Sequence, residues 1–162
     1  MNTVKTHRRI RAAVAGDAES ISKLICGLSE KYITGTLSLE GKRALLGSMS
    51  PAAIQKHLQS GYRYHVFETD GQLVGVVGVR DNSHLYHLFV ADGYQRQGVA
   101  SRLWKAAMGA CVEQASPRVF TVNSSMNAVG VYEKFGFVAM SERVEKNGVV
   151  FVPMKLTVTT QQ

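Results

Sequence analysis

Leu88-Phe-Val-Ala-Asp-Gly-Tyr-Gln-Arg-Gln-Gly-Val-Ala-Ser-Arg-Leu103 is the stretch that decides the fold. Its apolar start is typical of a strand, its polar middle contains glycine, and a helical pattern begins at Gly98. Small residues let backbone N–H groups approach an anion, and a helix N terminus adds unpaired donors and a favourable dipole. The segment 95–101 therefore predicts a phosphate-binding turn. The alternative is an ordinary strand–loop–helix corner with a solvated Arg96.

The composition is that of a globular protein. The chain has 162 residues, of which 45% are hydrophobic and 19% charged, which suits one domain with a core of its own. We expect a single domain over 1–162, with a flexible segment at 1–8 and a tail at 158–162. No apolar run approaches the roughly 20 residues of a membrane span, and the basic N terminus lacks the apolar region of a signal peptide. These features predict a cytoplasmic protein without membrane attachment.

The formal net charge of +7 suits either a nucleic acid or a polyanionic cofactor. Apart from 5–11, the basic residues are scattered, and no stripe of alternating aromatic and basic residues marks a nucleic-acid surface. Nucleic-acid binding is therefore the weaker alternative. Cys26 and Cys111 fall in expected helices and are interpreted as small core side chains. No Cys/His spacing indicates a metal site, so we expect no metal.

Hydrophobic periodicity and turn signals divide the chain into alternating elements. The segment 33–48 is expected to hold a short helix followed by a mobile loop, and 73–79, apolar on both faces, a central strand covered on both sides. Asn147-Gly148 predicts the turn of a final hairpin. The pattern indicates an α/β domain of the three-layer α+β type with a mixed sheet. Strands are expected at 9–14, 62–69, 72–80, 84–91, 118–123, 137–144 and 149–157, and helices at 18–32, 51–60, 98–114 and 126–135.

Two motifs resemble one family. Gln95-x-x-Gly98-x-Ala100 resembles the pyrophosphate-binding signature of the GNAT superfamily of N-acetyltransferases, with Ala100 in place of a second glycine. Asn123-Ser-Ser-Met-Asn-Ala-Val-Gly-Val-Tyr-Glu-Lys-Phe-Gly-Phe137 resembles the family's second signature, N-x-x-A-x-x-x-Y-x-[KR]-x-G-F, with Asn127-Ala128 followed by Tyr132, Lys134 and Gly136-Phe137. The resemblance extends over about 10–156. It implies a GNAT-like mixed, mostly antiparallel sheet of about seven strands flanked by about four helices.

The resemblance also implies how acetyl-CoA, the expected cosubstrate, would be held. The backbone of the strand would pair with the pantetheine arm, the turn would hold the pyrophosphate, and two asparagines would form hydrogen bonds to the cofactor. The alternative for the asparagines is a role as turn and cap residues. The expected cofactor-binding residues are Leu88, Phe89, Val90, Gln95, Arg96, Gln97, Gly98, Val99, Ala100, Ser101, Asn123 and Asn127.

Two residues are the catalytic candidates. In the second motif, Tyr132 corresponds to the general acid that protonates the departing thiolate; without the motif it would be a core tyrosine of an amphipathic helix. His84 resembles, by its spacing from Gln95, the position where some relatives place a glutamate base, and histidine has a suitable pKa near 6.5. His87, a water chain, or a merely solvated His84 are the alternatives.

The leading hypothesis is an N-acetyltransferase that moves the acetyl group of acetyl-CoA directly to a primary amine of a small molecule or peptide in a ternary complex. One alternative is a non-catalytic acyl-CoA-binding sensor or interaction module, and another is a basic nucleic-acid-binding domain. Glu30 and Glu40 lie in the region that relatives use for the acceptor and are candidates to bind one ammonium. Many relatives dimerise, and the sequence leaves a homodimer open.

Overall fold

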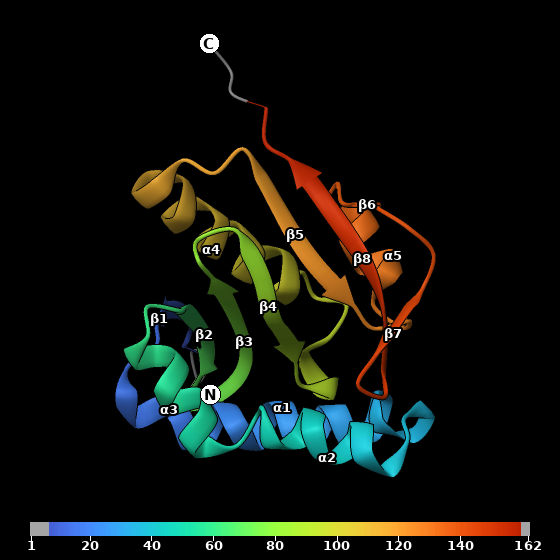
Figure 1. Ribbon diagram of the computed structural model, residues 1–162. Helices are drawn as coiled ribbons and strands as arrows, with labels where there is room; N and C mark the ends of the chain where they lie inside the picture. Colours follow the sequence, from blue (N-terminus) through green and yellow to red (C-terminus); the bar gives the residue numbers. More distant parts are fainter. Residues whose placement is uncertain (1–6, 160–162) are drawn as a thin grey trace.

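The computed structural model describes residues 7–159, in which eight strands and five α-helices form a layered α/β arrangement (Figure 1). The expected mixed sheet with helices on its faces is confirmed. None of the helices in this part of the chain is long and apolar enough to cross a membrane. The elements are β1 (Arg8–Ala12), α1 (Ala18–Tyr32), α2 (Leu39–Gly47), α3 (Pro51–Gln59), β2 (Arg63–Thr69), β3 (Gln72–Arg80), β4 (His84–Val90), α4 (Val99–Ala115), β5 (Val119–Ser124), α5 (Val129–Lys134), β6 (Val138–Ala139), β7 (Val144–Lys146) and β8 (Val149–Thr157).

The sheet has the order β1-β2-β3-β4-β5-β8-β6, with β7 also paired to β8. All neighbouring strands are antiparallel except β4 and β5, which run parallel. Parallel neighbours need a crossover connection, which α4 provides here. Because β4 and β5 enter this sheet in the same direction, both strands also end at the same edge.

The sheet has a hydrophobic cluster on each face. On one face, side chains of α4 and α5 such as Leu103, Trp104 and Tyr132 pack with Phe120 of β5. On the other face, α1 and α3 pack against β2 and β3. Strand β3 contributes to both clusters and is buried from Val74 to Val79. The prediction of a central strand covered on both sides is therefore confirmed.

The region between α1 and α3 contains the expected short helix, but it occupies the later part of the segment and no long loop follows it. A 3₁₀ turn at Thr34–Thr36 leads into the nine-residue α2, and only 48–50 separate α2 from α3. The side chain of Ser38 caps α2 by accepting the N–H of Gly41 at 3.0 Å. Gly41 in turn packs against the β7–β8 turn, where a Cβ at this position would lie 2.4 Å from the carbonyl oxygen of Gly148. The leucines of this segment follow no clean helical period because this helix is short and largely exposed.

The last hairpin is also interrupted. The single strand expected at 137–144 is wrong, since β6 and β7 are two short strands that both pair with β8. The carbonyl of Pro153 accepts the N–H of Met140 at 2.8 Å. Proline has no N–H to return to the same neighbour, so the ladder breaks there. Helix α5 is shorter than expected and begins at Val129 rather than 126.

Candidate functional site

The candidate site begins where β4 and β5 separate. Only two residue pairs join these strands, His84 with Thr121 and Leu85 with Val122. Beyond these pairs the two strands diverge toward their C-terminal ends, and α1 runs across the open end (Figure 1). The edge of β4 that faces β5 therefore has no strand partner after Leu85, which leaves backbone groups for an extended ligand.

The turn after β4 presents the start of α4 to this opening. Arg96 has a φ of 60° and Gly98 a φ of 78°, so both lie in the left-handed region. No side chain caps α4, whose first-turn N–H groups are left for another acceptor. The side chain of Gln95 turns back and donates to the carbonyl oxygen of Val90 at 2.9 Å. This combination is an anion-binding turn of the kind predicted from the sequence.

Strand, turn and helix line a cleft of about 560 Å³ together with α1 and α5. The structure places eleven of the fourteen predicted site residues in its wall. These are Leu88, Phe89, Val90, Gln95, Arg96, Gly98, Val99, Ala100, Ser101, Asn127 and Tyr132.

Three predicted residues lie outside the wall. The side chain of Gln97 donates to the carbonyl oxygen of Gly93 at 3.2 Å and accepts from Arg8 at 3.2 Å. Asn123 is an exposed residue of β5 that pairs with Pro153 of β8. His84 lies at the paired end of β4, where its Nδ1 is 2.7 Å from the hydroxyl of Thr121. The structure thus separates His84 from the other catalytic candidate, Tyr132.

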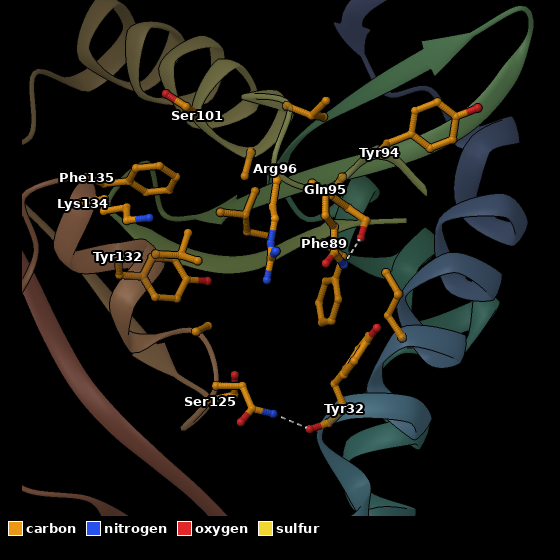
Figure 2. A pocket seen from close by; sticks show the side chains of 18 of the residues that line it. Tyr32, Phe89, Tyr94, Gln95, Arg96, Ser101, Ser125, Tyr132, Lys134 and Phe135 are labelled. Carbon is orange, nitrogen blue, oxygen red and sulfur yellow. Dashed lines mark hydrogen bonds between the residues drawn. The ribbon is translucent and has the colours of Figure 1, made fainter. Parts of the chain in front are cut away.

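Tyr132 has its ring in the core and its hydroxyl in the cleft. Its ring is buried beside Phe135 and Phe137, at centroid distances of 6.2 and 5.8 Å. Its hydroxyl points into the cleft, and none of the side chains drawn in Figure 2 forms a hydrogen bond to it. Burial raises the pKa of Tyr132 above its ordinary value. The phenol therefore keeps its proton at neutral pH and is placed to donate it to a ligand atom.

Both histidines of β4 are neutral at neutral pH. Desolvation lowers the pKa of His84 to about 4, and the nearby Arg80 adds to the effect. Desolvation likewise lowers the pKa of His87 to about 3, with a smaller contribution from His57. Nδ1 of His87 lies 2.9 Å from the hydroxyl of Tyr64, inside the core. Either imidazole is in the form that accepts a proton.

The end of α1 is the part of the site that the sequence did not reveal. Leu28, Tyr32 and Ile33 line the cleft. The periodicity of this helix had indicated only a core-facing side for Leu28 and Tyr32, yet Tyr32 is 43% exposed. Its hydroxyl donates to Asp92 at 2.5 Å, and Lys31 binds the other carboxylate oxygen of Asp92 at 2.5 Å. These residues line the cleft because α1 extends past the edge of the sheet, and the sequence carries no local signal for that course.

Other lining residues come from the turn after β4, from the loop between β5 and α5, and from α5 and its end. They are Tyr94, Ser125, Ala128, Val131, Lys134 and Phe135. Lys134 and Phe135 belong to the second motif, so the motif itself could have identified them.

Arg96 and Lys134 are the only charged side chains among the lining residues, and both are cations. The electrostatics of the cleft therefore favour an anionic ligand. Within residues 7–159, no group of three or more His, Cys, Asp or Glu side chains is arranged to hold a metal ion.

Solved structures share this mixed α/β sheet that splits beside the start of a helix. A GCN5-related N-acetyltransferase from Rhodopseudomonas palustris is similar with a TM-score of 0.78 at 21% identity, over 98% of this chain and 100% of that one. The PaiA N-acetyltransferase from Thermoplasma acidophilum, solved with coenzyme A, is similar with a TM-score of 0.75 at 16% identity, over 94% of this chain and 99% of that one. N-acetylglutamate synthase from Neisseria gonorrhoeae, complexed with coenzyme A and N-acetylglutamate, gives 0.69 at 18% identity, over 96% of this chain but 36% of that one.

The family follows from the sequence match. Residues 33–158 match the model of the acetyltransferase (GNAT) domain, and the chain therefore belongs to the GNAT family. No curated protein matches the sequence significantly. The resemblance inferred from the two motifs is thus confirmed, and the fold is consistent with acyl transfer from coenzyme A.

Proposed function

We propose that this protein is an N-acetyltransferase that transfers the acetyl group of acetyl-CoA directly to a primary amine in a ternary complex. One observation carries the proposal: the protonated phenol of Tyr132 opens onto the same cleft as the unpaired edge of β4 and the uncapped start of α4. A proton donor, a strand edge and an anion site in one cleft are what thioester aminolysis requires.

The residues present fit acetyl-CoA as the donor. The pyrophosphate is assigned to the turn at 95–101, where first-turn N–H groups of α4 and the cation of Arg96 are available. The pantetheine arm is assigned to the free edge of β4 at Leu88–Val90, as an added strand. Asn127 donates one N–H of its Nδ2 to the carbonyl oxygen of Tyr32 at 2.8 Å, so its second N–H and its Oδ1 are available to the cofactor.

Bound acetyl-CoA would supply an activated thioester carbonyl. The amine nitrogen forms a C–N bond to the acetyl carbon as the C–S bond breaks, and Tyr132 donates its proton to the departing sulfur. The proton lost by the amine goes to solvent or, as we propose, through water to a neutral histidine of β4. His84 is our first candidate for this acceptor because it is neutral at neutral pH and less buried than His87, which is the alternative.

The first test is the melting temperature with and without acetyl-CoA. At 100 times its Kd, a specific ligand stabilises the folded state by about 2.7 kcal/mol, which corresponds to several degrees for a domain of this size. Thiol release with a mixture of primary amines then tests turnover. Tyr132→Phe should keep the ligand-induced rise in melting temperature and lower kcat by about 10²- to 10⁴-fold. Tyr62→Phe, which removes a phenol outside the cleft wall, is the matched control.

Three results would separate the hypotheses. A melting shift without thiol release for any amine would leave a non-catalytic acyl-CoA-binding module. Salt-sensitive binding to DNA or RNA, with no response to acetyl-CoA, would favour a nucleic-acid-binding domain. Equal kcat in wild type and Tyr132→Phe would remove Tyr132 from the role of general acid.

A further inference from the structure

The cleft has two chemically different sides. Tyr132, Lys134 and the start of α4 form the side that we assign to the cofactor and its proton donor. The opposite side consists of Leu28, Tyr32, Ile33 and the ring of Phe89. Figure 2 shows Phe89 and Tyr32 across the cleft from Tyr132.

The two sides meet at β4, and the direction of its side chains explains the division. Leu88 and Val90 pack into the cluster on the α4 face, whereas Phe89 packs with the cluster under α1 and α3. The backbone of these three residues faces the split in the sheet. If the pyrophosphate occupies the turn at 95–101, an arm paired to this backbone would run from Val90 toward Leu88 and pass the ring of Phe89. We call Leu28, Tyr32, Ile33 and Phe89 the α1 wall.

The α1 wall offers no negative charge. No Asp or Glu occurs among the lining residues that the structure describes, and the two lining cations, Arg96 and Lys134, are not part of this wall. Asp92 lies nearby, but both of its carboxylate oxygens are engaged by Lys31 and Tyr32. Glu30 and Glu40, the acidic candidates from the sequence, are exposed and do not line the cleft. A second ammonium on the acceptor would lose water here and gain no counter-ion.

We propose, resting on the proposed function, that the acceptor is a primary monoamine carried on an apolar or aromatic group and that the α1 wall binds this group. The wall also prepares the nucleophile. An amine has to be neutral to attack a thioester, and apolar surroundings disfavour the ammonium form. The same surface that selects the carbon skeleton thereby favours the reactive protonation state.

The decisive experiment compares three acceptors at saturating acetyl-CoA by thiol release: 2-phenylethylamine, 1,5-diaminopentane and L-glutamate. We expect kcat/KM for 2-phenylethylamine to exceed the other two values by about 10- to 100-fold, the factor for burying one phenyl-sized group. A preference for the diamine or for glutamate would overturn the inference while leaving the proposed function intact. No thiol release with any of the three, although the mixture of primary amines supports turnover, would also overturn the inference. No thiol release with the mixture either, despite a melting shift with acetyl-CoA, would mean that the proposed function itself has failed.

A second experiment introduces a charge into the α1 wall. Leu28→Glu should lower kcat/KM for 2-phenylethylamine at least tenfold and narrow or reverse its advantage over the diamine. Lys23→Gln, on the exposed side of α1, changes the net charge by the same one unit and should leave the preference as in wild type. If Leu28→Glu proves unfolded by its melting curve, Phe89→Leu tests the same wall without adding charge, and it should reduce the advantage of the aromatic amine over n-hexylamine. An unchanged ratio in either folded variant would contradict the role of the α1 wall.

Discussion

The side-chain amide of Asn127 donates to the backbone carbonyl of Tyr32 at 2.8 Å, although 95 residues separate them in the chain. This bond ties the loop after β5 to the last turn of α1. The hydroxyl of the same Tyr32 donates to Asp92, in the turn after β4. The end of α1 thus connects both lips of the cleft, across the place where the sheet itself has no hydrogen bonds.

Removing this connection should loosen the hold on the cofactor. Asn127→Ala loses the bond to Tyr32, and we expect the Kd for acetyl-CoA, measured by calorimetry, to rise about fivefold, the value of one hydrogen bond of about 1 kcal/mol. Tyr32→Phe loses only the bond to Asp92 and should give a smaller rise. Gln55→Ala, on an exposed position of α3, is the control. A Kd unchanged in both cleft variants would show that the connection does not affect cofactor binding.

The proposed acid and base of the enzyme should not limit kcat over a broad pH range. Tyr132 has to be protonated to act as an acid, and its raised pKa keeps it so beyond the ordinary value of about 10. A base histidine has to be neutral, and the pKa of His84 near 4 keeps it so down to that pH. Between about pH 5 and 9.5 we therefore expect kcat to follow only the ionisation of the acceptor amine, which has to be neutral to attack.

Two histidine variants identify the group that accepts the proton of the amine. His84→Gln should lower kcat at least tenfold if His84 takes the proton, whereas His87→Gln should do so if His87 does. Their melting temperatures must be compared, because His87 is buried and bonded to Tyr64. A fall in wild-type kcat near pH 6.5 that is the same for acceptor amines of different pKa would contradict a base with a strongly lowered pKa.

Acid should destabilise the fold well above the range in which carboxylates titrate. The pKa values of His84 and His87 are about 4 and 3 in the folded protein, against about 6.5 in the unfolded chain. The unfolded state therefore takes up protons first as the pH falls. Their stabilising contribution is complete above pH 6.5 and decreases below it, by about 1.4 kcal/mol per pH unit for each histidine once the unfolded form is protonated. Urea midpoints at pH 7.5, 6 and 5 measure this slope, which should be shallower in His84→Gln.

The contact between α2 and the last hairpin should tolerate no methyl group. In Gly41→Ala, the new Cβ would lie 2.4 Å from the carbonyl oxygen of Gly148 and 3.2 Å from its Cα. Both obstacles are backbone atoms, so we expect a loss of about 1–3 kcal/mol in unfolding free energy. Gly27→Ala is the matched control, because Gly27 lies inside α1 with no atom within 4 Å of its Cβ position. The unfolding free energy of the control variant should rise by up to about 1 kcal/mol. Equal melting temperatures for the two variants would refute the contact.

The sequence predicted the elements that carry strong local signals. Helix α1 has the predicted bounds 18–32, and the β2–β3 hairpin turns at Asp70-Gly71 as expected. The turn at 95–101 combined glycine, small side chains and a helix start, and for that reason most of its residues could be assigned to the site in advance. These features depend on neighbours a few residues apart.

The parts that were missed depend on contacts between distant segments. The cap on α2 is local, but its fixed position comes from Gly41 against Gly148, more than 100 residues later in the chain. The split of the strand expected at 137–144 follows from Pro153 on the partner strand. Leu28 and Tyr32 look like core positions on a helical wheel, and only the three-dimensional course of α1 past the end of β4 brings them to the cleft.

Only two residue pairs join β4 to β5, so the connection between the two halves of the sheet is narrow. Strands β1–β4 pair with one another on one side of it, and β5, β8 and β6 pair on the other. An extended molecule bound in the split would bring these two cooperative units closer to acting as one. A ligand in the cleft would therefore stabilise the narrowest connection within the sheet.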